Sequence, residues 1–112
     1  MNINIVEDFT ECTGGRYKRN GEYSGEEFRE TILLPKYKEA YNKNEKLIVD
    51  LDGGFGYGTS FLEEAFGGLV RSINLKEAKK IKELLVIKCE DAPRYIEKIN
   101  NYINAALKEK KV

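Results

Sequence analysis

A short apolar run that opens into a glycine-rich loop and then into an apolar helix is the feature that most constrains this fold. The run is Leu47–Leu51, the loop is 52–58, and two hydroxyl residues, Thr59 and Ser60, follow it. A β-rich run of this length is typical of a buried central strand, and the segment 60–72 carries a wide apolar face. The sequence therefore predicts a strand–loop–helix turn that exposes backbone N–H groups beside two small alcohols.

The rest of the chain alternates between strand and helix patterns. Apolar residues within 2–9 predict an opening strand, 84–87 predicts a third strand, and helical patterns lie between and after the strands. This alternation predicts an α/β fold, with helices packed on a small, largely parallel or mixed sheet through right-handed crossovers. With 112 residues and neither an internal repeat nor a linker, we expect 1–112 to form one domain.

Capping and helix-breaking residues suggest where the helices begin and bend. Ser24 with Glu27 three residues later predicts a capping box at the start of a helix. Pro35 lies inside that helix, where we expect a kink or two short helices. Gly67 and Gly68 lie inside the helix that follows the glycine-rich loop, and we expect them to let its backbone approach the sheet closely.

A polar, turn-rich stretch covers residues 11–24, where the alternatives are a short strand around 16–19 and a simple bend. Arg16, Lys18 and Arg19 make this stretch basic, with Tyr17 and Tyr23 beside them. We expect a solvated loop with one tyrosine folded onto the core, and the alternative is a contact patch for an acidic partner. Near the other end of the chain, Asp91 is expected to cap the last helix.

Charge and hydropathy argue against several classes of partner. Lys+Arg and Asp+Glu both total 19, so the formal net charge is zero, whereas a surface that binds nucleic acid normally needs a basic excess. No apolar run approaches the roughly 18 residues of a membrane-spanning helix, and the first residues carry no basic-then-apolar leader. We therefore expect a cytoplasmic protein that binds neither nucleic acid nor membrane.

The absence of histidine from the chain removes much catalytic chemistry. Ser–His and Cys–His pairs are excluded, as is acid–base catalysis by an imidazole at neutral pH. Zinc sites usually need several Cys or His ligands, and only Cys12 and Cys89 are present, far apart in the sequence. We expect both thiols to stay reduced, and we expect a protein without a cofactor or metal that is not an enzyme.

The candidate functional residues gather in the glycine-rich loop and at the start of the next helix. They are Asp52, Phe55, Tyr57, Gly58, Thr59 and Ser60. Tyr57 lies between glycines and is expected to be an exposed aromatic contact. For Ser60 the alternative role is structural, because Ser60 and Glu63 have the spacing of a capping box, which would leave Thr59 as the freer hydroxyl.

Two carboxylates, Asp50 and Asp52, bracket Leu51 at the end of the predicted strand. Two carboxylates alone are a weak indication of a metal site, so we expect one to accept hydrogen bonds from loop amides and the other to be solvated. The loop lacks the lysine of a phosphate-binding P-loop, which disfavours nucleotide hydrolysis by that route. Its glycines are expected to supply unusual backbone angles.

Three segments of the chain resemble a known family. The run Leu47–Arg71 contains Val-Asp-Leu-Asp-Gly-Gly-Phe-Gly-Tyr-Gly-Thr-Ser-Phe-Leu-Glu-Glu-Ala-Phe-Gly-Gly-Leu and, with 15–17 and 23–29, is similar to bacterial STAS-like domains of uncharacterised function. The resemblance covers roughly residues 13–90 and is most specific in Thr-Ser-Phe-Leu-Glu-Glu-Ala-Phe-Gly-Gly. More distantly, the layout resembles the STAS domains that act as anti-sigma factor antagonists.

The more distant resemblance implies a regulatory role. In those proteins a serine at the loop-to-helix junction is phosphorylated, and the partner is a histidine-kinase-like ATPase; by position the hydroxyl here is Thr59 or Ser60. The chain departs from that pattern at Gly58, where an acidic residue is common, and at Phe61, where a small residue is common. We expect the glutamates 63–64 to lie in the first turn of the helix and to repel an incoming phosphate.

These observations together predict a regulatory protein-interaction module that docks a partner through the 53–62 loop and the following helix. The alternative is a small-molecule or nucleotide sensor that uses the same loop as an anion cradle. A third hypothesis is an enzyme that depends on Asp50 or Asp52.

Overall fold

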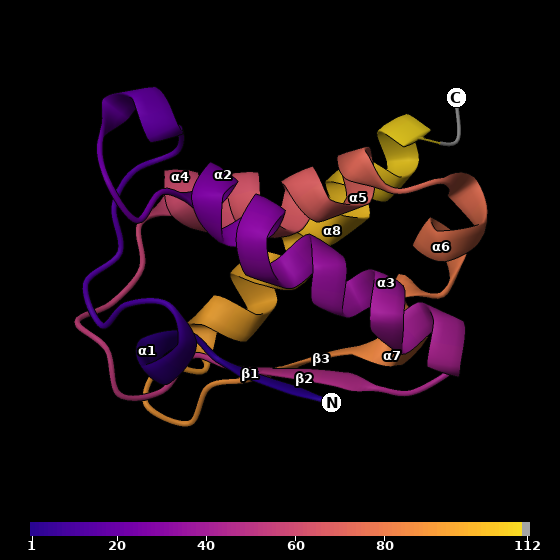
Figure 1. Ribbon diagram of the computed structural model, residues 1–112, viewed down its shortest axis with the longest axis horizontal. Helices are drawn as coiled ribbons and strands as arrows, with labels where there is room; N and C mark the ends of the chain where they lie inside the picture. The colour runs from indigo at the N-terminus through magenta and orange to yellow at the C-terminus, as the bar shows by residue number, and fades with distance from the viewer. Residues whose placement is uncertain (111–112) are drawn as a thin grey trace.

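The computed structural model describes residues 1–110, which fold as a three-stranded sheet with helices packed on one face (Figure 1). The strands are β1 (Asn2–Asn4), β2 (Leu47–Asp50) and β3 (Leu85–Lys88). Both pairs are parallel and the strand order is β1-β2-β3. The predicted α/β fold is confirmed, with a sheet that is parallel throughout.

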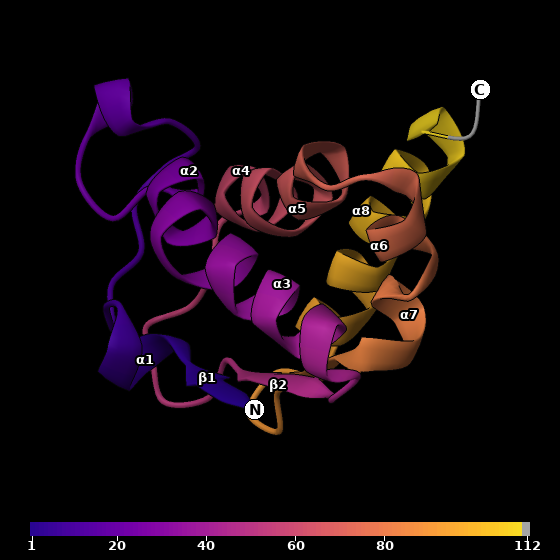
Figure 2. The ribbon, with the colours of Figure 1, turned by 45° about the vertical axis from the view of Figure 1, so that its right-hand side comes forward.

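The helices connect the strands and cover one face of the sheet. Their bounds are α1 Ile5–Asp8, α2 Gly25–Phe28, α3 Leu34–Lys43, α4 Thr59–Leu62, α5 Gly68–Ser72, α6 Leu75–Lys79, α7 Ile81–Leu84 and α8 Arg94–Lys110. A 3₁₀ turn covers Lys18–Asn20 (η1), and π-helical turns cover Arg29–Leu33 (η2) and Glu63–Gly67 (η3). In Figures 1 and 2 the long helical segments all lie on one side of the strands.

Alternation along the strands separates an inner face from an outer face. Ile3, Val49 and Leu85 are buried beneath the helices. Ile48 and Val86 are neighbours in register on β2 and β3, and they keep 37% and 36% of their surface exposed. Figure 1 shows the sheet edge-on, and none of the long helices of residues 1–110 lies against that outer face.

The opening strand is shorter than the pattern in 2–9 predicts, because Asn4 caps a helix. Its side chain accepts a hydrogen bond from the Glu7 N–H at 3.1 Å, while the Asp8 carboxylate accepts one from the Asn4 N–H at 2.8 Å. This local bonding ends β1 and begins α1 at Ile5. The alternative of a strand at 16–19 is also wrong, since the 3₁₀ turn η1 lies there.

Ser24 caps α2 as predicted, but the Glu27 side chain accepts from the N–H of Tyr23 and not from the N–H of Ser24, as it would in a standard capping box. The Ser24 hydroxyl accepts from the Glu27 N–H at 3.0 Å, and the Glu27 carboxylate accepts from the Tyr23 N–H at 3.2 Å. The predicted division of this helix near Pro35 is confirmed, because the π turn η2 separates α2 from α3. Pro35 itself does not lie at the break. It lies in the first turn of α3, directly after the π turn η2, where the Leu34 N–H bonds to a carbonyl five residues back.

Neither glycine of the second helical segment faces the sheet, so that prediction is wrong: Gly67 lies beneath the side chains of Glu63 and Arg71, and Gly68 faces another helix. A Cβ at Gly68 would lie 2.3 Å from the Arg29 guanidinium, and a Cβ at Gly25 would lie 2.5 Å from the carbonyl oxygen of Phe61. The α2–η2 segment therefore crosses α4–η3 at very close range. Phe28 and Phe61 stack beside the crossing, with ring centroids 5.9 Å apart.

The crossing leads to a prediction for Gly25→Ala. The added methyl group would meet backbone that cannot move aside, so we expect a loss of about 2 kcal/mol in the free energy of unfolding, measured by urea denaturation. The matched control is Gly15→Ala, because a Cβ at Gly15 meets no atom within 4 Å, and we expect a change within about 0.5 kcal/mol. Equal losses in the two variants would contradict the close crossing.

Candidate functional site

The loop between β2 and α4 lies at the carboxyl edge of the sheet, beside the loop that follows β3 (Figure 1). In open α/β sheets this edge is where ligands and partners usually bind. The six candidate residues all lie on this loop or on the first turn of α4, which begins at Thr59. Their roles nevertheless differ, because some of them hold the loop and others are presented to solvent.

Asp52 fastens the two loops together. Its carboxylate oxygens accept hydrogen bonds from the N–H groups of Glu90 at 3.0 Å and Asp91 at 2.9 Å. In return, the Asp91 carboxylate accepts from the Gly53 N–H at 3.1 Å. The backbone hydrogen bonds from Asp91 and Glu90 lower the pKa of Asp52 from its ordinary value of 3.8. We call this exchange between Asp52 and Asp91 the carboxylate clasp.

The hydrogen bonds around the carboxylate clasp show that two of the predicted roles, those of Asp91 and Asp50, are wrong. Asp91 does not cap the last helix, which begins three residues later at Arg94, and its carboxylate binds the Gly53 N–H instead. Asp50 is not simply solvated, because it accepts from the Asp52 N–H at 2.9 Å and lies 3.7 Å from the Lys88 ammonium. Residues 1–110 contain no cluster of three or more potential metal ligands.

Tyr57 is half-buried, so its predicted role as an exposed contact is wrong. Its hydroxyl donates to the Leu51 carbonyl at 2.7 Å, and its N–H donates to the Tyr95 hydroxyl at 3.2 Å. The ring lies edge-on to Tyr95, with centroids 5.4 Å apart, and 6.0 Å from the ring of Phe61. Burial raises the pKa of Tyr57 above its ordinary value. Tyr57 therefore anchors the loop to α8 and to the core.

Phe55 is the aromatic residue that the loop presents to solvent. Its side chain is 80% exposed, while its N–H donates to the Glu11 carbonyl at 3.0 Å and so fixes the backbone beneath it. Gly53 and Gly56 flank it with φ angles of 95° and 111°, which confirms that these glycines supply backbone angles that other residues rarely adopt. The sequence identified Phe55 as a candidate, and in the structure an anchored loop presents its ring to solvent.

The two hydroxyls at the start of α4 are both exposed. The predicted capping box at Ser60 is wrong, because Gly58 occupies the N-cap position and Ser60 is the second residue of the helix. Neither the Thr59 nor the Ser60 hydroxyl makes a hydrogen bond within the described part of the chain. The helical segment 59–72 therefore begins with N–H groups that no side chain caps and with two free alcohols.

Arginines surround Glu63 and Glu64, one turn after the hydroxyls. Arg16 bonds to Glu63 and lies 3.3 Å from Glu64, Arg71 donates to Glu63 at 2.8 Å, and Arg29 bonds to Glu64. The hydrogen bond from Arg71, followed by that from Arg16, lowers the pKa of Glu63. The expected repulsion of a phosphate by these glutamates is therefore offset. Sequence reasoning missed this cluster, for which the basic loop at Arg16 was the available signal.

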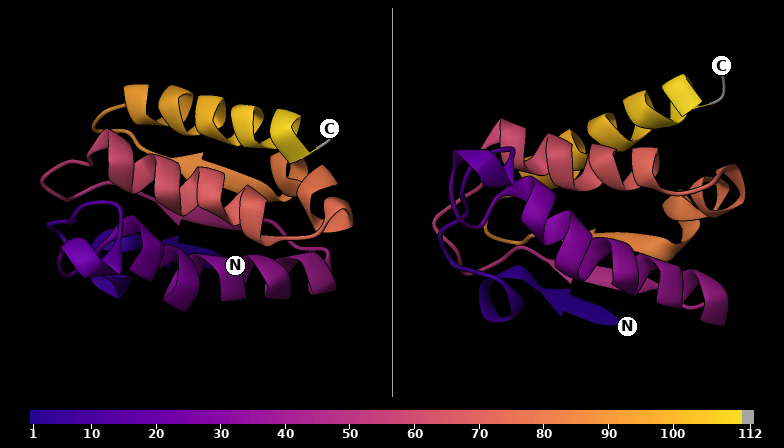
Figure 3. Two further views of the ribbon diagram at one scale, coloured as in Figure 1. Left: turned by 90° about the horizontal axis from the view of Figure 1, so that it is seen from above. Right: turned by 45° about the horizontal axis from the view of Figure 1, so that its top comes forward.

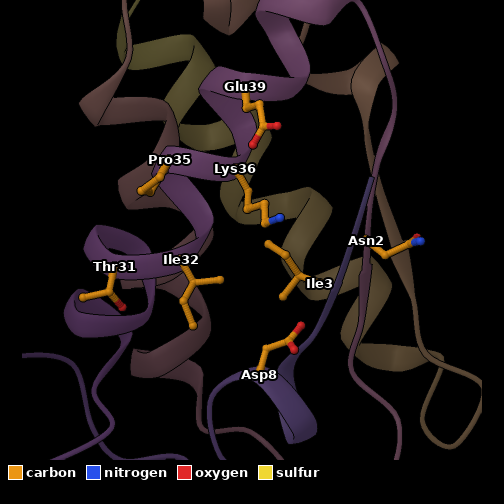
Figure 4. Close-up of a pocket in the computed structure, with 8 residues that line it drawn as sticks. All are labelled: Asn2, Ile3, Asp8, Thr31, Ile32, Pro35, Lys36 and Glu39. Carbon is orange, nitrogen blue, oxygen red and sulfur yellow. The ribbon is translucent and has the colours of Figure 1, made fainter.

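A separate hollow of about 420 Å³ lies along the outer edge of β1 (Figure 4). Ile3 of the strand and Ile32 and Lys36 of the facing helix line it, and none of the six candidate residues does. Its two carboxylates already have partners, since Asp8 accepts from the Asn4 N–H and Glu39 pairs with Lys43 at 3.0 Å. This groove is distinct from the surface formed by the 52–58 loop and by Thr59 and Ser60, which we call the rim.

Comparison with known proteins identifies one family. A family model described as a STAS-like domain of unknown function matches residues 24–93, which is more than half of the chain. No curated protein and no solved structure matches the chain. None of the helices in residues 1–110 has the length and apolar character that crossing a bilayer requires.

The carboxylate clasp leads to a prediction for Asp52→Asn, in which one acceptor oxygen replaces two. At neutral pH we expect faster hydrogen exchange at the amides of Glu90 and Asp91 and a lower urea midpoint. A carboxylate whose pKa is lower in the folded than in the unfolded state stabilises the fold fully when the pH is above the unfolded-state pKa. This stabilisation is lost as the pH falls through the folded-state pKa. The difference in midpoint between wild type and variant should therefore shrink as the pH falls below 3.8.

The matched control for that experiment is Glu11→Gln, an exposed carboxylate beside the same loop. We expect it to leave both amides and the midpoint unchanged. A difference between wild type and Asp52→Asn that stays constant down to about pH 2 would contradict the role of the ionised carboxylate.

Proposed function

The chain belongs to the family of STAS-like domains of unknown function, and on that premise we propose that it is a regulatory module that docks a partner protein through the 53–62 loop and the following helix. The observation that carries the proposal is an exposed aromatic side chain, Phe55, beside two free hydroxyls on one anchored rim. Aromatic residues are common anchors of protein interfaces. A loop that is already ordered loses little conformational entropy on binding.

Phosphorylation of Thr59 or Ser60 is the proposed switch. It would add nearly two negative charges at the start of α4, where no side chain caps the N–H groups. The nearby guanidinium of Arg16, which is partly exposed, would compensate part of that charge. We therefore expect the modified hydroxyl to be tolerated by the fold and to change the surface that a partner meets.

The proposed partner is a histidine-kinase-like ATPase, and the proposal rests on the resemblance to anti-sigma factor antagonists. We further propose that the domain is not an enzyme, because the chain has no histidine and both Asp52 oxygens already accept backbone N–H groups. A cytoplasmic location is part of the proposal. The free thiols of Cys12 and Cys89 are typical of a reducing compartment.

One observation favours a second candidate function, a sensor that binds a small anion or nucleotide at this rim. The first turn of α4 offers N–H groups without a side-chain cap, and such groups bind phosphates readily. Under this alternative, a nucleotide alone would raise the melting temperature of the purified protein. Under the regulatory proposal, no nucleotide would do so in the absence of a protein partner.

Site-specific photo-crosslinking tests the regulatory proposal. With p-benzoylphenylalanine in place of Phe55, we expect one protein to be captured in the native cells and to be identified by mass spectrometry as an ATPase of the histidine-kinase-like class. The matched control places the same group at Val86, which is also exposed but lies on the outer face of the sheet. Capture of the same proteins from both positions would contradict docking at the rim.

The switch is tested with the partner captured in that way. Incubation with the ATPase and ATP should add one phosphate to the intact mass of the wild type and none to a Thr59→Ala/Ser60→Ala variant. Thr59→Glu or Ser60→Glu should change the affinity for the partner by about threefold or more, without lowering the melting temperature, because both side chains are exposed. An unmodified wild type with unchanged affinities would exclude the switch.

A further inference from the structure

A small apolar pit lies between α6, α7 and the end of α8. Figure 2 shows these three helical segments next to one another, at the opposite end of the ribbon from α1. Leu75, Ala78 and Leu107 provide its apolar lining, and Lys79 and Lys82 provide the rest. Leu75 is 44% exposed at the start of α6. The pit thus combines an uncovered large apolar side chain with two flanking ammonium groups.

The size of the pit limits what can occupy it. Its volume is about 150 Å³, whereas sites for small molecules usually measure roughly 300–1,000 Å³. The space suits a single apolar side chain, as in the pockets that receive anchor residues at protein interfaces. The pit is therefore a better receptor for part of a peptide than for a metabolite.

The charges around the pit are not balanced by neighbours. The segment 75–84 contains four lysines and two glutamates, although the whole chain has no net charge. Glu77 is buried and bonds to the Asn74 N–H, and Glu83 pairs with Lys80 at 3.1 Å. Lys79 and Lys82, by contrast, make no ion pair within the described residues. This side of the molecule therefore carries a local positive excess around an apolar centre.

We propose that the pit is a docking site for an acidic segment of a partner protein, which inserts one apolar side chain between Leu75 and Leu107 and places carboxylates against Lys79 and Lys82. The complementary charges would orient the segment, and the apolar side chain would be its anchor. An anionic membrane surface fits less well. Membrane-surface helices present a long, convex apolar face, whereas α6 and α7 have five and four residues and enclose a concavity.

Fluorescence anisotropy tests the site with a synthetic probe, a fluorescein-labelled peptide of sequence Glu-Glu-Ala-Leu-Glu-Glu-Ala-Glu. We expect binding below about 1 mM, and a loss of about tenfold in affinity in the double variant Lys79→Glu/Lys82→Glu. The matched control is Lys46→Glu/Lys98→Glu, which makes the same charge change at two exposed lysines outside the pit. The control should change the affinity by less than about twofold.

Two further measurements separate the pit from general electrostatic attraction. Leu75→Ser in the protein, and serine in place of leucine in the peptide, should each weaken binding by about fivefold or more. Circular dichroism melting checks that the variants fold, as the exposure of the substituted side chains leads us to expect.

Three outcomes would overturn the proposal. They are no binding of the peptide up to about 1 mM, equal losses in the pit and control double variants, and lysine-dependent binding to vesicles containing anionic phospholipid in place of the peptide. The proposal is independent of the proposed function, because crosslinking at Phe55 and peptide binding at Lys79 use different surfaces. Either can fail while the other stands.

Discussion

The order of the strands is the constraint on which the rest of this structure depends. The chain moves from β1 to β2 to β3 in one direction across a parallel sheet. Crossovers of the usual right hand, made twice in the same direction, deliver their helices to the same face. All the long helices therefore stack on one side of three short strands (Figure 3), and every loop that follows a strand emerges at one edge.

This one-sided packing forces the helices against each other as much as against the sheet. The crossing of α2–η2 with α4–η3 is close because Gly25 and Gly68 have no side chain to hold it apart. Arg29 fills the space over Gly68 and binds both the carboxylate and the carbonyl of Glu64. The two π turns lie at this crossing, as is common where helices adapt locally to a neighbour or a functional site.

The sequence correctly predicted features that depend on neighbouring residues. It failed for side chains whose role depends on a contact with a residue far away in the chain. The apolar run of β2, the cap at Ser24 and the glycine angles of the loop follow from neighbouring residues, and they are confirmed. The role of Tyr57 depends on Tyr95, which lies 38 residues away, and the role of Asp52 depends on the loop after β3. The helix begins at Thr59 and not after Ser60. The local pattern could not predict this, because long-range hydrogen bonds hold the loop that precedes the helix.

The electrostatics of the rim follow from the same distant contacts. Two glutamates one turn into the helix would by themselves oppose a negative group at Thr59, but three arginines from three parts of the chain surround them. Arg29 also lies 3.7 Å from Glu30, so the three guanidinium groups compensate the carboxylates beside the uncapped N–H groups, and they do so at any physiological pH because arginine stays protonated. The repulsion that these glutamates would exert on the phosphate of the proposed switch is therefore reduced by charges that the fold already holds in place.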